Sequence, residues 1–207
     1  MSEPYYFCGC YAEVGVATSR KWTKSKLNWA VRGMLPGLTT AEQHNAVVAA
    51  FATWQNVCGL AFFESSVNQP ADINLTTGRI DGSGQVLAWS EFPAGTRSVT
   101  QKYDTSERFV VAESPTWPQI DLLAVACHEI GHALGLDHDR EGSGSLMEPV
   151  YKPGRRVPQQ RDIMRIQALY GIPDEPKPNP ERIARLMRIY DQHGDLMAAY
   201  PLGDRVV

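Results

Sequence analysis

The stretch that most constrains this chain is His128 to His138, with the sequence HEIGHALGLDH. Two histidines four residues apart on a helix, His128 and His132, project from one face, so both imidazoles can reach one ion with Glu129 beside it. Gly135 ends the helix, because glycine enters the left-handed conformation without steric cost. The turn that follows can return His138 as a third nitrogen ligand. Three protein ligands leave one position of a tetrahedral zinc ion for water, which is the arrangement of a catalytic site.

A family resemblance follows from this spacing, HExxHxxGxxH, which is that of the metzincin zinc proteases. Metzincins also carry a methionine turn beneath the zinc, and the downstream segment SLMEPVY supplies Met147 for it. Its Leu-Met-x-Pro-x-Tyr string resembles the matrixin branch, the matrix metalloproteinase type. Asp139 departs from that branch, which usually has Ser after the third histidine, and is similar to the adamalysin type. Apart from the resemblance, an amphipathic helix with surface or core histidines is the alternative.

The resemblance implies a metalloendopeptidase, a hydrolase of internal peptide bonds in proteins or peptides. Zinc would polarise water and the scissile carbonyl, and Glu129 would take the proton and pass it to the leaving amine. Ala124, four residues before the first histidine, helps to set the depth of the S1′ pocket, with Pro149 and Tyr151 in the wall after the methionine turn. Two alternatives remain: an adamalysin-like metzincin, and a catalytically silent zinc-binding adhesion or scaffold domain. The retained Glu129 argues against the silent domain.

The composition indicates the broad class of protein to which the chain belongs. The chain has 207 residues, 43% hydrophobic and 21% charged, which fits one globular domain with a tail. Its net charge of −3 and scattered Lys and Arg give no basic stripe, so we expect no nucleic-acid partner. No run of 18 apolar residues predicts a membrane span. The N-terminus, MSEPYYFCGC, lacks the pattern of a signal peptide, whereas the family resemblance implies a secreted, extracellular protein. We expect a monomer.

Three regions are predicted: an N-terminal segment (1–19), a matrixin-like catalytic domain (20–172), and a proline-rich linker with a short C-terminal tail (173–207). Cys8 and the glycine after it loosely resemble the cysteine switch of matrixin zymogens, in which a thiolate occupies the fourth zinc position. Cys10 competes for this role, and idle thiols or a surface disulfide are the alternatives. Cys58 and Cys127 are predicted to be small buried hydrophobes.

The predicted fold class is α+β, a metzincin catalytic domain with a twisted mixed five-stranded sheet and three helices, as the resemblance implies. Thr39 and Glu42 form a capping box before a helix that ends near Gly59. Asp121 is the predicted N-cap of the zinc helix, and Pro158 opens a last helix that Gly171 ends. Strands are expected over 21–32, 60–65, 71–77, within 81–93, and over 108–114, the last of them. The tail is a helix or a hairpin turning at His193 and Gly194, and we favour the hairpin.

Two further metal sites are weighed by resemblance. In matrixins a calcium loop precedes the edge strand beside the cleft, and oxygen ligands of the kind that calcium prefers are present here. The alternative is a solvated Asp-Gly turn with two surface acids. A second, structural zinc is not expected, because Trp89 and Lys102 stand at two of its histidine positions and the loop before Asp81 is short. The calcium set comprises the carboxylates of Asp81, Asp104 and Glu107 and the carbonyls of Gly82, Gly84 and Val86.

Overall fold

The structure, a computed structural model, describes residues 20–173 together with the backbone of 189–190 and 196–198. Residues 20–173 belong to one compact unit. In the other unit, β8 (Ile189–Tyr190) pairs antiparallel with β9 (Leu196–Ala198). This pairing agrees with the hairpin and not with the helical alternative. The turn predicted at His193 and Gly194 lies outside the described residues, as does the N-terminal segment with Cys8 and Cys10.

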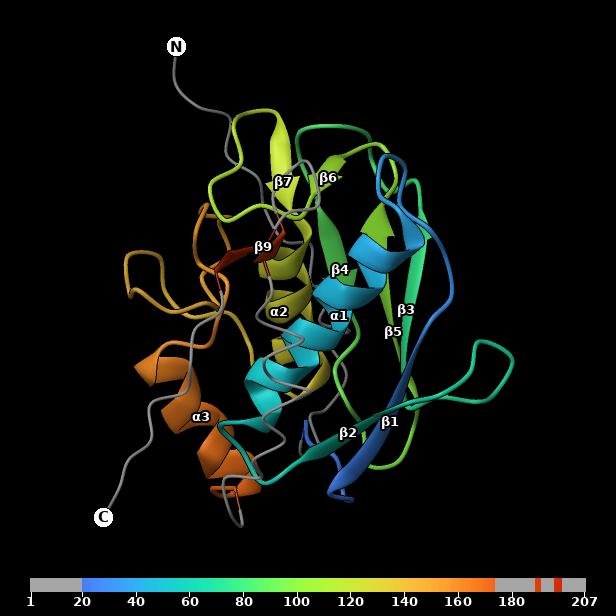
Figure 1. The fold of residues 1–207 in the computed structure, drawn as a ribbon. Coiled ribbons are helices and arrows are strands. Elements are labelled where there is room, and N and C mark those ends of the chain that lie inside the picture. The colour runs from blue at the N-terminus through green and yellow to red at the C-terminus, as the bar shows by residue number, and fades with distance from the viewer. Residues whose placement is uncertain (1–19, 174–188, 191–195, 199–207) are drawn as a thin grey trace. The chain divides into compact units, whose positions relative to one another are not determined.

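A five-stranded mixed sheet with the strand order β2-β1-β3-β5-β4 forms one layer (Figure 1). Parallel pairing joins β2 (Ala61–Glu64), β1 (Lys26–Val31), β3 (Ile73–Gly78) and β5 (Val99–Asp104). The last strand, β4 (Ala88–Ser90), pairs antiparallel with β5 and forms an edge. The predicted fold class, a mixed five-stranded sheet with three helices, is therefore confirmed.

β5 was not predicted from the sequence, and the strand expected over 108–114 forms over 108–110 only and is not the last one. β5 reads VTQKYD, and its polar Gln101 is fully buried, so no clean apolar alternation marks it. The strand forms because β3 and β4 satisfy its backbone on both sides. The apolar run expected as the last strand pairs over only three residues, as β6 (Arg108–Val110), beside β7 (Gln119–Asp121) in a separate two-stranded parallel sheet. Beyond it, Val111 is exposed.

Two helices, α1 (Thr40–Gln55) and α2 (Leu122–Ala133), pack against each other beside the sheet (Figure 1). The predicted capping box begins α1: Glu42 N–H donates to Thr39 Oγ1 at 3.2 Å, and Thr39 N–H donates to the Glu42 carboxylate at 2.8 Å. Asp121 caps α2, as expected, by accepting from Ala124 N–H at 3.3 Å. Almost every residue of α2 is buried, so the helix runs through the core rather than along the surface.

The third helix, α3 (Gln160–Tyr170), starts two residues after Pro158 and ends at Gly171, whose φ of 75° lies in the left-handed region that favours glycine. Its Ile166 is fully buried. Tyr170 Oη donates to the carbonyl of Leu134 at 2.7 Å and accepts from Trp22 N–H at 3.0 Å. The last helix thus fixes the end of α2, just before the residues that lead to His138.

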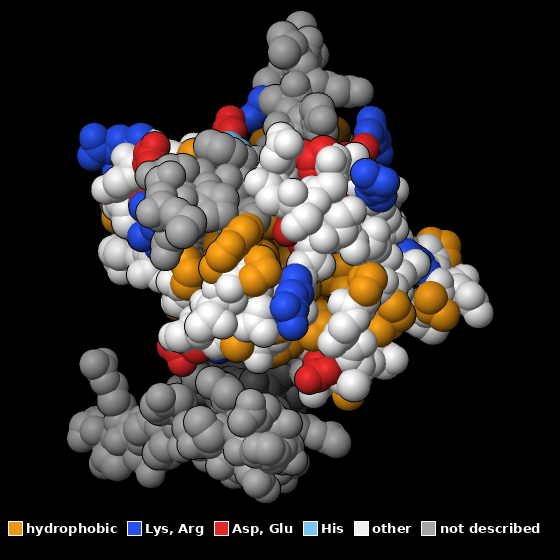
Figure 2. Space-filling model, turned by 90° about the horizontal axis from the view of Figure 1, so that it is seen from above, with side chains coloured by type: hydrophobic (Ala, Val, Ile, Leu, Met, Phe, Trp, Pro, Cys, Tyr) orange, Lys and Arg blue, Asp and Glu red, His pale blue; other side chains and the backbone are white. Residues whose placement is uncertain are grey.

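Charged side chains of both signs are scattered over one face of the molecule. Figure 2 shows Lys and Arg side chains in several separate places on the face seen from above, with Asp and Glu between them. This distribution agrees with the absence of a basic stripe in the sequence. Within the described part of the chain, no helix has the length and apolar character needed to cross a membrane.

Candidate metal centre and adjoining pocket

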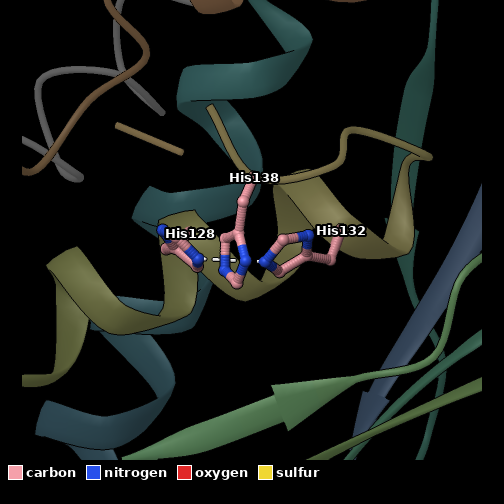
Figure 3. Close-up of side chains that lie close together, drawn as sticks. All are labelled: His128, His132 and His138. Carbon is pink, nitrogen blue, oxygen red and sulfur yellow. Dashed lines mark hydrogen bonds between the residues drawn. The ribbon is translucent and has the colours of Figure 1, made fainter. Parts of the chain in front are cut away.

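Three histidines converge at the end of α2. His128 and His132 project from the helix, and His138 enters from the loop that follows it (Figure 3). Their ligand nitrogens all lie within 4.8 Å of one another, and the Nε2 atoms of His128 and His132 are 3.0 Å apart. The structure therefore brings together the three residues that the spacing of the motif predicts to be ligands.

Backbone carbonyls orient two of the rings. His128 Nδ1 lies 2.8 Å from the oxygen of Leu146, and His132 Nδ1 lies 2.7 Å from the oxygen of Leu136. Because a carbonyl only accepts, each Nδ1 carries the proton and each Nε2 keeps a lone pair for an ion. Leu136 belongs to the turn that Gly135 begins, with φ of 99°. The turn that returns His138 therefore also holds His132 in its ligand tautomer.

Burial keeps the cluster neutral. Desolvation lowers the pKa of His128 to about 4, lowers the pKa of His132 well below its ordinary value, and lowers the pKa of His138. Within the described chain, the buried His138 Nε2 has no hydrogen-bond partner. Three neutral imidazoles, one with an unsatisfied buried nitrogen, are a donor set suited to zinc. The residues present fit this ion.

A pocket adjoins the cluster, and Glu129, which is fully buried on α2, lines it together with His128. The three residues that the resemblance implies for the S1′ pocket, Ala124, Pro149 and Tyr151, line the same pocket. Of the other lining residues, Leu87, Val125, Leu146 and Val150 are apolar, whereas Glu148, Lys152 and Arg155 are charged.

The turn that contains Met147 contacts α2 at Gly131 and through the Leu146 carbonyl at His128, and Met147 is fully buried. It is held by Asp162 of α3, whose carboxylate accepts from Leu146 N–H at 2.7 Å and from the hydroxyl of Ser145. Asp162 also accepts from Gln159 N–H at 2.8 Å. One buried carboxylate thus fixes both the start of α3 and the methionine turn. This role of Asp162 was not predicted from the sequence, although a carboxylate three residues after the N-cap is a usable signal.

The glycine-rich loop of residues 81–86 contains Asp81, and the other two carboxylates of the predicted calcium set, Asp104 and Glu107, accept hydrogen bonds from its amides. Asp104 accepts from the amides of Asp81 and Gly82 at 3.1 and 3.2 Å, and Glu107 accepts from Gly84 N–H at 2.6 Å. Val86 N–H donates to Asp81 at 3.3 Å. Burial raises the pKa of Glu107, and the charges of Asp104 and Asp81 raise it further. The predicted residues lie together, with their negative charges repelling one another.

Trp89 and Lys102, which stand at two positions of the structural zinc site of matrixins, are directly opposite each other on β4 and β5. Lys102 Nζ donates to the carbonyl of Arg79 at 3.0 Å. A side-chain cation therefore stabilises the backbone just before the glycine-rich loop. The expectation of no second zinc stays a prediction.

The sheet, the buried helix with two histidines and the turn that returns the third define a metzincin-type catalytic domain. A sequence profile of the matrixin family matches residues 21–171, so the chain belongs to this family. It is 29% identical to matrix metalloproteinase-16 of Homo sapiens in an alignment 179 positions long, which covers 78% of this chain and 29% of that protein. It is 33% identical to matrix metalloproteinase-18 of Xenopus laevis over 184 residues, 82% of this chain and 38% of the relative.

A bacterial protein is similarly related. Karilysin of Tannerella forsythia is 31% identical over 169 residues, which cover 76% of this chain and 35% of karilysin. The chain therefore spans only 29% to 38% of the length of these relatives. The family match shows which family the domain of residues 21–171 belongs to, and it does not by itself show the activity of the protein.

Proposed function

We propose that this protein is a zinc-dependent endopeptidase that hydrolyses internal peptide bonds of proteins or peptides. The observation that carries the proposal is the convergence of His128, His132 and His138 beside a pocket that His128 and Glu129 line. The three histidines would hold the ion. Membership in the matrixin family supports the same activity.

The chemistry that zinc supplies in such a site is Lewis acidity, which lowers the pKa of water towards 7 and polarises a carbonyl. Glu129 acts as the general base and then as the acid: it takes the proton from the attacking water and delivers it to the leaving nitrogen as the C–N bond breaks. Leu146 and Leu136 hold His128 and His132 in position through their carbonyls. Met147 supports the site from below.

Substrate would lie extended along β4. This strand is an edge of the sheet, so its outer side can pair with a peptide backbone. In this arrangement the pocket lined by Ala124, Pro149 and Tyr151 receives the side chain that follows the scissile bond. Ala124 is small, and the pocket is also lined by the apolar residues Leu87, Val125, Leu146 and Val150. We therefore propose a preference for Leu, Met or larger apolar residues at this position of the substrate.

Calcium is a second proposed ion, bound by Asp81, Asp104 and Glu107 with the carbonyls of Gly82, Gly84 and Val86. Its support is electrostatic. Three carboxylates lie close enough for the charges of Asp104 and Asp81 to raise the pKa of Glu107, and a divalent cation would remove that repulsion. We further propose, from the family alone, that the protein acts outside the cell.

Two alternatives differ in their predictions. In an adamalysin-like enzyme Asp139 would have a role of its own, but here Asp139 forms an ion pair with Arg161 of α3. A silent zinc-binding domain would bind the ion and cleave nothing. Zinc content and turnover measured on the same sample distinguish this domain from a peptidase.

The test compares the wild type with Glu129→Ala on a peptide library, with metal analysis of both proteins. We expect about one zinc per chain in each protein, and we expect the variant to lose turnover by several orders of magnitude, because its base is missing. Glu113→Gln, a change at an exposed acid outside the pocket, is the control and should keep full activity. Unchanged cleavage by Glu129→Ala would exclude this mechanism.

A further inference from the structure

Besides its apolar residues, the pocket has a cluster of three charged side chains in its lining. Glu148, Lys152 and Arg155 all line the pocket together with His128 and Glu129. The Glu148 side chain is only 1% exposed, and its two oxygens contact different cations: Lys152 Nζ at 2.5 Å and Arg155 at 2.9 Å. This cluster follows the methionine turn, within the segment that forms the pocket wall.

The cluster carries a net positive charge. Burial alone would raise the pKa of Glu148, but hydrogen bonds from Lys152, Gly144 and Arg155 outweigh it and lower the pKa to about 2. The carboxylate is therefore ionised, and it neutralises one of the two cations. Two positive charges and one negative charge leave this cluster of Glu148, Lys152 and Arg155 with a single positive charge.

Lys152 and Arg155 differ in how they are held. Arg155 also donates to the carbonyl of Ser145 at 2.7 Å, so its guanidinium is engaged in fixing the turn. Lys152 has an ammonium with three N–H donors, one of which is directed at Glu148. Its side chain is 39% exposed, against 23% for Arg155. Lys152 is the better placed of the two to meet a substrate side chain.

We propose that Lys152 is a specificity-determining residue of this pocket, and that the enzyme favours substrates in which glutamate follows the scissile bond over those with lysine or arginine. The inference rests on the proposed function. The methylene groups of glutamate contact the apolar wall, and its carboxylate accepts from the ammonium of Lys152. A cationic side chain would meet like charge in a partly desolvated site. Apolar residues such as Leu remain substrates and are insensitive to the charge.

The experiment uses the zinc-loaded full chain and peptides that differ only after the scissile bond, with Leu, Glu or Lys there. The measured quantity is the ratio of kcat/KM for the Glu peptide to that for the Lys peptide, with the Leu peptide as reference. We expect this ratio to exceed about 10 in the wild type and to fall about tenfold in Lys152→Met, the size of effect that one charge-assisted contact gives. High salt should also lower the ratio.

Two further variants make the result specific. Lys152→Arg keeps the charge and should keep the preference for glutamate. Lys24→Met is the matched control, because Lys24 also pairs with a single carboxylate, that of Asp72, and its side chain is 40% exposed, but it does not line the pocket. Its ratio should equal that of the wild type. Thermal unfolding of each variant checks that the fold is intact.

The outcomes separate the inference from the proposed function. A wild type that cleaves the Leu peptide but does not distinguish Glu from Lys overturns the inference and leaves the peptidase activity established. An equal loss for all three peptides in Lys152→Met also overturns it, since Lys152 would then only hold the wall in place. A wild type that cleaves none of the three peptides, nor any in the library, overturns the proposed function and this inference with it.

Discussion

The sulfur of Met147 lies too close to Gly131 to leave room for a β-carbon there. A side chain at Gly131 would overlap with Met147 Sδ and approach Trp54 Cζ2 to 3.0 Å. Gly131 is the residue before the second histidine of α2, and Met147 belongs to the turn whose Leu146 carbonyl holds His128. The absence of a side chain at Gly131 thus lets the methionine turn pack directly against α2.

Gly131→Ala should therefore destabilise the protein even though alanine is the better helix former. Overpacking a core of this kind costs about 1–3 kcal/mol, which exceeds the roughly 1 kcal/mol that Gly to Ala gains in a helix. We expect a lower melting temperature and weaker zinc binding, measured by thermal unfolding and by titration with a chelator.

A double-mutant cycle tests the cause. If the clash is with Met147, Gly131→Ala combined with Met147→Ala should be less destabilised than the sum of the two single changes. Additive effects would place the cost elsewhere, at Trp54 for example.

The cluster of three histidines could be predicted from the sequence because its signals are local. The histidine spacing fixes two ligands on one helix face, Gly135 marks the turn, and the caps at Thr39 and Asp121 mark the starts of two helices. These features depend on neighbouring residues, and the structure places each where it was expected.

What the sequence could not show depends on contacts across the fold. β5 forms because β3 and β4 pair with its backbone on both sides. Its buried polar residue Gln101 breaks the apolar pattern by which a strand is recognised in the sequence. The segment between the methionine turn and α3 buries Arg156 and Pro158, although its residues are mostly polar or turn-forming. Glu148 and Lys152 are four residues apart, but the segment between them is not helical. Their spacing alone therefore does not predict the ion pair or its place in the pocket wall.

The depressed pKa of Glu148 predicts a response to acid. A carboxyl whose pKa is lowered in the folded state stabilises the protein above its ordinary pKa of about 4.5, and this contribution is lost as the pH falls towards 2. We expect the difference in unfolding free energy between the wild type and Glu148→Gln to be largest above pH 5 and to shrink between pH 4.5 and 2. Urea denaturation across this range measures it. A difference that does not change with pH would contradict the assignment.

The buried pair of Arg156 and Asp121 predicts a large stability effect. Arg156 is 9% exposed and donates to both oxygens of Asp121 at 2.8 and 3.3 Å. Burial raises the pKa of Asp121, and Arg156 counteracts this. Arg156→Met leaves a buried carboxylate unpaired, which costs about 3–5 kcal/mol. Urea denaturation should show this loss, and Asp121→Asn combined with Arg156→Met should recover part of it.

The calcium proposal predicts that calcium raises the melting temperature of calcium-stripped, zinc-loaded protein, since a ligand that binds only the folded state stabilises it. Asp104→Asn should abolish the response, because Asp104 is the fully buried carboxylate of the set. Glu113→Gln, at an exposed acid outside the set, is the control. An unchanged melting temperature of the wild type on adding calcium would remove the site.

The cysteine-switch hypothesis makes the last prediction, and chain geometry allows it. Arg20 lies against the loop of residues 135–138, which leads from α2 to His138. Its carbonyl leaves no room for a side chain at Gly135, and its guanidinium donates to Asp137 at 2.8 Å. Cys8 precedes Arg20 by 12 residues, and an extended chain spans up to about 3.5 Å per residue, so a reach of about 40 Å is available.

A thiolate is a strong zinc ligand and would exclude the water that the reaction needs. Cys8→Ser should therefore raise the activity of the full chain, and a chain starting near Ser19 should be fully active. Cys10→Ser is the matched control, because a serine at the neighbouring thiol leaves the switch in place. If Cys10→Ser activates and Cys8→Ser does not, Cys10 is the inhibitory thiol. Equal activity of all four proteins would leave the segment without an inhibitory role, because removing a zinc ligand must free the site it occupied.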